Sequence, residues 1–225
     1  MSSTGKSRAK ATKEARSRRR REQTRSEILD TARRVILRGG LANFTLADVA
    51  DELALTNPAL YYYFKSKEAL LFELFLREWL ELAAEVEAAV GETENGVDAV
   101  EQLMRTVFER YRERLELFML FHKMGPDGEF AGIIGAKEFE RIRPVNDMLY
   151  GGAESRLRAD QRTGGFPKKR NPRRFAFTAH MAVLGLLNMK AIAASADDPL
   201  IHSDDDLIDD LCMTFRDAAA QGGAQ

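Results

Sequence analysis

The residues best suited to chemistry lie between positions 57 and 67, where the chain reads NPALYYYFKSK. An asparagine amide can form two hydrogen bonds with the edge of an adenine, and a small apolar side chain can contact a thymine methyl group. Tyrosine hydroxyls and lysine ammonium groups bind phosphate oxygens, which fixes a protein on a duplex without reading its sequence. The composition of this stretch therefore favours contact with double-stranded DNA.

Individual roles follow from these residue types. Asn57, Pro58 and Ala59 are the candidates for contact with base edges. Thr45 and Thr56 are candidates for hydroxyl contacts with DNA, although N-capping of a helix would explain each threonine equally well. The predicted phosphate contacts come from side chains that carry a hydroxyl or an ammonium group: Tyr61, Tyr62, Lys65 and Lys67.

Two short helices are predicted to hold these side chains. Apolar residues spaced as on one helix face run from Leu46 to Leu53, and Thr45 before them is a plausible N-cap. A second helix is expected after Thr56, with Pro58 in its first turn, where proline is tolerated, and it continues through Phe64. Two short helices joined by so tight a turn form a helix-turn-helix.

The second of these helices has few residues that can enter a core. Only Leu60 and Phe64 are clear anchors, so several of the tyrosines at positions 61 to 63 must face outward. An ordinary helical hairpin with amphipathic tyrosines is the structural alternative. Outward tyrosines beside Asn57 instead favour a recognition helix whose N-terminal turn enters the DNA major groove.

The wider pattern, over roughly residues 24–75, includes Gly40, Thr45 and the runs 53–56 (LALT), 60–64 (LYYYF) and 67–70 (KEAL). Together these features resemble the N-terminal domain of TetR-family transcriptional regulators. Two positions depart from the family: it usually has glycine in place of Ala54, and often histidine in place of Tyr63. Ala54 must therefore accept the backbone angles that glycine adopts in this turn.

The overall composition is that of a soluble protein of 225 residues with a full core. Its single cysteine, Cys212, excludes an intrachain disulfide, suits a reducing cytoplasm and is expected to be a small hydrophobic residue. We expect no signal peptide, because the first 25 residues are basic and polar. The apolar run 175–194 contains His180, Asn188 and Lys190, which favours a buried helix over a membrane span.

The N-terminal arm, residues 1–23, is expected to be disordered in the free protein. Residues 1–22 carry nine lysines or arginines against two glutamates, whereas the whole chain has a net charge of −1. One interpretation is a solubilising tail or a cloning remnant. The other is an arm that follows the DNA backbone or enters the adjacent minor groove, as basic arms of other helix-turn-helix proteins do.

Helical periodicity continues along the remaining chain and predicts an all-α fold. Residues 24–68 are expected to form a three-helix DNA-binding domain, and residues 69–225 a helical domain for ligand binding and dimerisation. Helices are predicted over 97–122 and about 137–158, the latter kinked or divided by Pro144. The last two helices carry more apolar surface than one small domain buries, which predicts a homodimer held by a symmetric four-helix interface.

Candidates for a ligand pocket are the bulky apolar, tyrosine and histidine side chains of the second domain. Such a mixture suits a cavity for a mainly apolar small molecule. Each residue could instead be ordinary core, since aromatic and methionine stripes usually only pack. The family resemblance implies such a cavity without identifying its occupant. The candidates are Trp79, Phe108, Tyr111, Phe118, Phe121, His122, Met148, His180, Met181 and Leu184.

The segment from Arg156 to Arg174 holds eight basic residues against one acidic residue, Asp160. It is interpreted as a solvated loop, or as a loop that docks onto the acidic last helix. The alternative is a surface for DNA or a clamp for an anionic ligand such as an acyl-coenzyme A.

No motif of an enzyme, metal site or cofactor site is found. Walker loops, HExxH motifs and nucleophile elbows do not occur, and the three histidines lack metal-binding spacing. The sequence therefore predicts a cytoplasmic, ligand-responsive DNA-binding regulator that does not enter a membrane. The resemblance implies a repressor that an apolar or acyl molecule releases from a palindromic operator. Two alternatives remain: a DNA-binding protein without an effector, and a helical carrier or enzyme with a vestigial DNA-binding domain.

Overall fold

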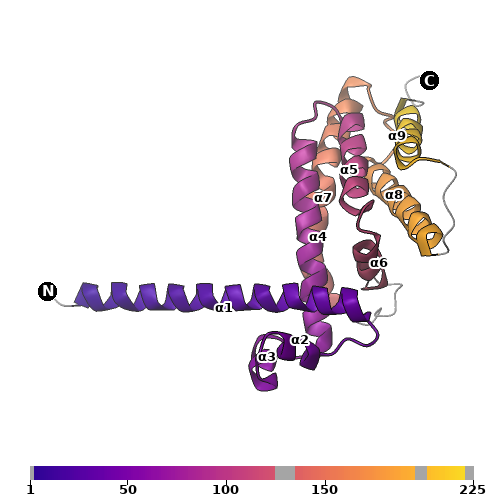
Figure 1. The fold of residues 1–225 in the computed structure, drawn as a ribbon. Helices are drawn as coiled ribbons and strands as arrows, with labels where there is room; N and C mark the ends of the chain where they lie inside the picture. The colour runs from indigo at the N-terminus through magenta and orange to yellow at the C-terminus, as the bar shows by residue number, and fades with distance from the viewer. Residues whose placement is uncertain (1–2, 125–134, 196–201, 221–225) are drawn as a thin grey trace. The chain divides into compact units, whose positions relative to one another are not determined.

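The computed structural model describes residues 3–124, 135–195 and 202–220, and their side chains within 13–121, 135–193 and 202–220. All regular elements in these ranges are α-helices, which confirms the predicted fold class (Figure 1). The chain divides into unit 1 (Met1–Leu74) and unit 2 (Phe75–Gln225). The division falls inside α4 (Lys67–Gly91), beyond the predicted boundary after residue 68, since Leu70 and Leu71 are buried within unit 1.

Unit 1 consists of α1 (Ser3–Gly39), α2 (Leu46–Glu52), α3 (Asn57–Tyr63) and the first turns of α4. α1 ends where Gly40 adopts a left-handed φ of 80° and donates its amide hydrogen to the Ile36 carbonyl at 2.8 Å. The core is formed by the apolar face of α1 and by the anchors of the shorter helices: Ile28, Leu29, Ala32, Val35, Ile36, Phe44, Val49, Leu60 and Phe64.

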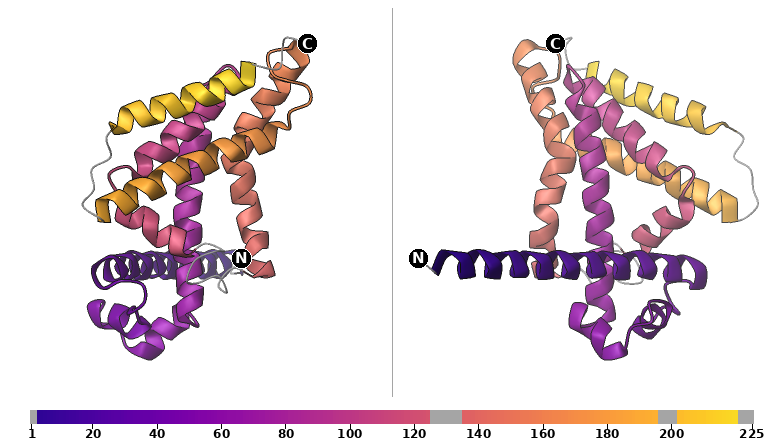
Figure 2. Two further views of the ribbon diagram at one scale, coloured as in Figure 1. Left: turned by 90° about the vertical axis from the view of Figure 1, so that its right-hand side faces the viewer. Right: turned by 60° about the vertical axis from the view of Figure 1, so that its left-hand side comes forward.

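The basic arm differs from its prediction, because α1 is one continuous helix that begins at Ser3 (Figure 2). The expected disorder is thereby corrected for residues 3–23, the part of the arm that the structure describes. Alanine, lysine, arginine and glutamate, which are frequent in the arm, are good helix formers. Once packing holds residues 28–36 in a helix, each preceding residue only extends it and no new nucleation is needed. The arm has few apolar residues and therefore cannot pack against a core, but its residues still favour a helix.

Local hydrogen bonds start α2 and α3 as predicted. The Thr45 hydroxyl accepts from the Asp48 amide at 3.3 Å, and the Asp48 carboxylate accepts from the Thr45 amide at 2.9 Å, which forms a capping box. These bonds from Thr45 hold the pKa of Asp48 below its usual value. Thr56 accepts from the Ala59 amide at 3.3 Å. Between the two helices, Ala54 has a left-handed φ of 53°, a conformation that costs an alanine about 1–2 kcal/mol.

Unit 2 contains the rest of α4 with α5 (Gly96–Tyr111), α6 (Leu115–Met124), α7 (Ala136–Thr163), α8 (Pro172–Ser195) and α9 (Asp204–Ala220). α5 packs against α7, α8 and α9 and is therefore central to the unit (Figure 1). At Gly96 a Cβ would lie 2.5 Å from the backbone nitrogen of Leu157, so only glycine permits this close approach of α5 to α7. The Gly96 amide also donates to the Asp160 carboxylate at 2.7 Å.

One predicted helix of unit 2 is wrong, and of the two outcomes expected at Pro144 one does not occur. The helix expected over 97–122 is divided into α5 and α6, with the Arg114 amide donating to the Tyr111 carbonyl at 2.8 Å in the turn between them. Neither glycine nor proline marks this break, and apolar periodicity continues on both sides, so the sequence pattern contains no signal for it. α7, in contrast, is not divided by Pro144, which lies inside it.

Candidate DNA-binding surface and ligand site

α3 presents two tyrosine rings on the surface of unit 1. Leu60 is fully buried and Phe64 is 2% exposed, whereas Tyr61 and Tyr62 are 48% and 56% exposed. Tyr63 is half-buried and packs edge-on against Tyr62, with 5.2 Å between ring centres. The predicted anchors and the predicted outward rings are therefore confirmed, except that the third tyrosine is shared between surface and core.

The other predicted DNA contacts surround these rings. Asn57 and Pro58 are exposed in the first turn of α3, and Ala59 is half-buried. The hydroxyls of Thr45 and Thr56 both accept backbone hydrogen bonds as N-caps. Capping thus accounts for both threonines, and a contact of either hydroxyl with DNA stays a prediction.

The two predicted lysines have different surroundings. Lys65 is exposed in the loop between α3 and α4. Lys67 is half-buried; its ammonium group donates to the Leu41 carbonyl at 3.4 Å and lies 5.5 Å from the centre of the Phe44 ring. Because these contacts hold the Lys67 ammonium group against unit 1, Lys65 is the more available of the two for a phosphate.

Arginines of α1 lie next to α3. The Arg21 guanidinium group lies 5.1 Å from the centre of the Tyr62 ring. One turn further along α1, Arg25 pairs with Glu73 of α4 at 2.9 Å. The whole run 18–21 is exposed, and through Arg21 it adjoins the outward ring of Tyr62. Sequence reasoning included the arm but could not place it against α3.

In unit 2, two of the predicted ligand residues belong to a polar aromatic group on three helices. The Trp79 ring of α4 stacks on the His180 ring of α8, with 5.8 Å between centres and 20° between planes. The Trp79 indole donates to the Asn146 side-chain carbonyl at 2.9 Å, and the Tyr150 hydroxyl lies 2.6 Å from His180 Nδ1. We call Trp79, Asn146, Tyr150 and His180 the Trp79–His180 cluster.

Two side chains of this cluster, His180 and Tyr150, are buried. His180 is fully buried, and burial lowers its pKa to about 4, so the ring is neutral at neutral pH. Burial also raises the pKa of Tyr150 above its ordinary value. Within the described part of the chain, His180 Nε2 is the one buried side-chain nitrogen or oxygen without a hydrogen-bond partner. Asn146 and Tyr150 are not among the residues predicted from sequence, because no local spacing links them to Trp79 and His180.

Among the other ligand candidates whose side chains the structure describes, none joins the cluster through a hydrogen bond. Phe108, Tyr111, Phe118 and Phe121 are buried core residues, and Met181 is 39% exposed on α8. Met148 and Leu184 are half-buried. His122 lies on α6, but its side chain is outside the described residues.

A second buried polar group connects α4 to α5. The Arg110 and Glu78 side chains, 7% and 5% exposed, form an ion pair at 2.6 Å. The Tyr111 hydroxyl donates to the Glu78 carboxylate at 3.2 Å. Although burial opposes the charge of Arg110, its carboxylate partners hold the pKa of Arg110 above the ordinary value. Sequence reasoning missed this pair, and a charged residue beside Trp79 in an apolar helix was the only signal that the sequence offered.

Most arginines of the segment from Arg156 to Arg174 are used within unit 2. Arg156 donates to the carbonyls of Gly91 and Thr93 at 3.0 and 2.9 Å. The segment does dock onto the last helix, but through the Arg170 guanidinium group and a backbone carbonyl of α9 at 3.0 Å, not through its carboxylates. The exposed basic side chains of the segment are Arg158, Arg162, Lys168, Lys169 and Arg174.

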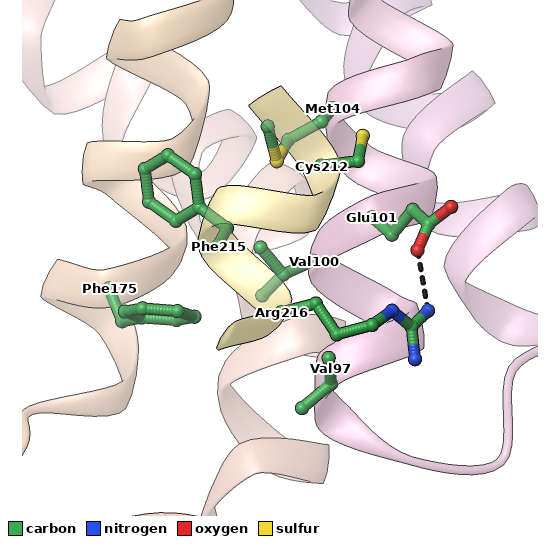
Figure 3. Close-up of a pocket in the computed structure, with 8 residues that line it drawn as sticks. All are labelled: Val97, Val100, Glu101, Met104, Phe175, Cys212, Phe215 and Arg216. Carbon is green, nitrogen blue, oxygen red and sulfur yellow. Dashed lines mark hydrogen bonds and ion pairs between the residues drawn. The ribbon is translucent and has the colours of Figure 1, made fainter. Parts of the chain in front are cut away.

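A narrow hollow lies among α5, α8 and α9 (Figure 3). It encloses about 190 Å³, part of it open to solvent, and is too narrow for a water molecule. Burial raises the pKa of the Cys212 thiol beside it to about 11, which agrees with a small hydrophobic role. None of the predicted ligand residues lines this hollow, which is bordered by Val97, Val100, Glu101, Met104, Phe175, Cys212, Phe215 and Arg216.

Comparison with known proteins agrees with the geometry of unit 1. Residues 28–74 match the family model described as bacterial regulatory proteins, tetR family. The chain is 31% identical to the HTH-type transcriptional regulator AcrR of Shigella flexneri over 124 residues, 49% of this chain and 54% of AcrR. It is 28% identical to the HTH-type transcriptional regulator TtgR of Pseudomonas putida over 92 residues, 41% of this chain and 43% of TtgR. The matches thus span about half the length of these curated relatives.

A solved structure extends the similarity in fold to both units. A TetR family transcription regulator from Marinobacter aquaeolei VT8 has a TM-score of 0.66 and 17% identity, over 90% of this chain and 98% of that chain. The family assignment rests on three findings: the all-helical fold of the described residues, the exposed face of α3 and the match over residues 28–74. Residues 28–74 belong to the tetR family of bacterial regulatory proteins, and both units share the fold of a solved TetR-family regulator.

Proposed function

We propose that this chain is a homodimeric transcriptional regulator that binds a palindromic operator through α3 and responds to a small molecule in unit 2. The observation that carries the proposal is the face of α3, where Tyr61 and Tyr62 stay exposed while Leu60 is fully buried. Exposed aromatic hydroxyls beside an exposed Asn57 are suited to a duplex. Two such helices related by a two-fold axis would enter successive major grooves.

The proposal assigns different roles to Asn57 and Tyr61, which two substitutions separate. Asn57→Ala is expected to change the preferred operator sequence, because a bidentate base contact is worth about 1–3 kcal/mol of discrimination. Tyr61→Phe is expected to weaken binding to all duplexes alike, by about 1 kcal/mol, because a phosphate contact carries no sequence information. Selection from a random duplex library and mobility-shift titrations measure both effects.

An unchanged sequence preference after Asn57→Ala would contradict the role of Asn57 in base contact. If the unsubstituted protein shifts no duplex, including the DNA upstream of its own gene, the proposed function itself fails.

We also propose that the basic part of α1 contacts the DNA backbone. Its support is the exposed run 18–21, with Arg21 held over the Tyr62 ring of α3. Replacing Arg18, Arg19 and Arg20 by alanine keeps helix-forming residues in the arm. The slope of log K against log salt concentration is then expected to become shallower by about 0.9 for each phosphate that the arm no longer neutralises.

The control for the arm removes three positive charges elsewhere, by alanine substitution of Arg162, Lys168 and Lys169, which are exposed in unit 2. This variant is expected to keep the original slope. An unchanged slope in the arm variant would leave the arm as a solubilising extension. A shallower slope in the control would instead assign DNA contact to the basic segment of unit 2.

The proposed dimer interface uses α8 and α9. One face of α8 is buried in unit 2, while Phe177, Met181, Met189 and Ile192 on another face are 39–55% exposed. The length and apolar composition of α8 alone would also suit a membrane span, but α8 packs against α5, α6, α7 and α9. An apolar stripe beside a packed face favours association with a second copy, for which a two-fold axis makes the same stripe self-complementary.

The proposed response to an effector works through α4, whose first turns belong to unit 1 and whose remainder belongs to unit 2. A mainly apolar or acyl molecule bound in unit 2 would favour a state in which α4 is shifted. In that state the distance between the two copies of α3 in the dimer would change. The protein would then act as a repressor that the effector releases. Such coupling is reciprocal, so operator DNA must weaken effector binding by the same factor.

A further inference from the structure

The Trp79–His180 cluster contains a buried group with an unused capacity for hydrogen bonding. We propose that His180 Nε2 anchors the effector, and that the effector carries an uncharged oxygen acceptor, such as the carbonyl of a ketone, aldehyde, ester or amide, on an apolar body. This inference rests on the proposed function, because it requires that unit 2 bind a small molecule. It adds the anchoring atom and the chemical class of the ligand.

The position of the proton on His180 follows from its single neighbour. A neutral imidazole has one N–H donor and one acceptor nitrogen. If the Tyr150 hydroxyl donates to Nδ1 at 2.6 Å, both groups of that contact are satisfied and the hydrogen must be on Nε2. If Nδ1 donated instead, the Tyr150 hydrogen would need another acceptor and Nε2 would also remain unpaired. The first arrangement leaves fewer buried polar groups unsatisfied, so His180 offers an N–H donor.

The rings around His180 favour an apolar ligand body. Phe75, Trp79 and His180 stack in sequence, with 6.1 and 5.8 Å between successive ring centres and plane angles of 11° and 20°. Tyr150 packs edge-on against Phe177, which is 46% exposed. Because Trp79 is half-buried and Phe177 is exposed, the cluster lies close to solvent.

The charged side chains described beside the cluster are already paired. Arg173 lies 5.8 Å from the centre of the Tyr150 ring, but it pairs with Asp147 at 2.6 Å and Glu154 at 3.2 Å. Glu78, which precedes Trp79, pairs with Arg110 at 2.6 Å. A carboxylate would therefore enter without a free cation, and burying an unpaired charge is costly. A carbonyl oxygen needs only the one donor that His180 provides.

The test compares 2-undecanone with undecanoate, which have the same number of carbon atoms and differ in charge. Trp79 is the only tryptophan of the chain and stacks on His180, so its fluorescence reports binding at the cluster. The ketone is expected to bind at least about tenfold more tightly than the carboxylate. His180→Phe keeps an aromatic ring but removes the donor, and should lower ketone affinity about tenfold, the value of one hydrogen bond.

Two further variants separate a binding role from a structural one. His180→Gln keeps an N–H donor and is expected to restore part of the ketone affinity. His202→Phe, at an exposed histidine, serves as the matched control and should change nothing. Thermal unfolding checks the fold. His180→Phe is expected to lower the unfolding temperature, because it leaves the buried Tyr150 hydroxyl without its acceptor, so affinities are compared at a temperature at which every variant is folded.

Three results would overturn the inference: equal affinities for ketone and carboxylate, a ketone affinity unchanged by His180→Phe, or no ketone binding up to its solubility. The second result is the one expected if Nε2 holds only a structural water molecule. Mobility shifts distinguish this failure from failure of the proposed function. Operator release by undecanoate but not by 2-undecanone would preserve an effector response while refuting the neutral carbonyl ligand.

Discussion

Arg110→Ala is expected to lower the free energy of unfolding of unit 2 by about 3–5 kcal/mol. The Arg110 and Glu78 side chains are 7% and 5% exposed, so the substitution leaves a buried carboxylate without its cation. The other partners of Arg110, Glu81 and Glu85, are half-exposed and can be hydrated by water. Urea unfolding followed by the fluorescence of Trp79 measures the effect, because this single tryptophan lies in unit 2.

Two controls test whether the buried charge is the cause. Arg105 pairs with Glu101 and Asp209 at 2.9 and 2.7 Å but is 35% exposed, so Arg105→Ala should cost less than about 1 kcal/mol. Adding Glu78→Gln to Arg110→Ala removes the unpaired charge, and the double variant should be more stable than Arg110→Ala alone. If Arg105→Ala and Arg110→Ala lowered the free energy of unfolding equally, the buried ion pair would contribute no more to stability than an exposed one.

Gly185→Arg is expected to convert the proposed dimer into a monomer and to lower operator affinity roughly 10²–10⁴-fold, the usual gain from joining two binding heads. Gly185 lies four residues from both Met181 and Met189, in the middle of the exposed apolar stripe of α8. A Cβ at Gly185 would meet nothing within 4 Å in its own protomer. The absent side chain leaves room for close approach of a second α8, and an arginine there adds bulk and charge to the interface.

The fold of the protomer should survive this substitution, since arginine is a better helix former than glycine by roughly 1 kcal/mol. Gly151→Arg is the matched control, because Gly151 lies within α7 and also has no atom within 4 Å of a Cβ position. It should remain dimeric and keep its operator affinity. Sedimentation and mobility-shift titrations decide the matter, and a dimeric Gly185→Arg protein with unchanged affinity would exclude this face of α8 as the interface.

Local sequence determined the helix-turn-helix. The Thr45–Asp48 capping box and the Thr56 cap each close within three residues, and the anchors Leu60 and Phe64 are one helical turn apart. The family resemblance, with glycine usual at position 54, predicted in addition the backbone angles that Ala54 adopts. Interactions that close within one turn depend only on spacing along the chain, so the sequence is sufficient to predict them. The exposure of the tyrosines can be predicted as well, because Leu60 and Phe64 fix the buried face of this short helix and that face cannot also hold three tyrosine rings.

Tertiary structure alone decided which polar groups meet in unit 2. Glu78 and Arg110 are 32 positions apart, Trp79 and Asn146 are 67 apart, and Tyr150 and His180 are 30 apart. An apolar stripe indicates that one face of a helix is buried. The same stripe is compatible with many partner helices and with many rotations about the helix axis. Contacts between particular side chains require one register and one crossing angle, which arise only when all helices pack together. The unpartnered Nε2 of His180, on which the proposed effector chemistry depends, could therefore be found only in the folded chain.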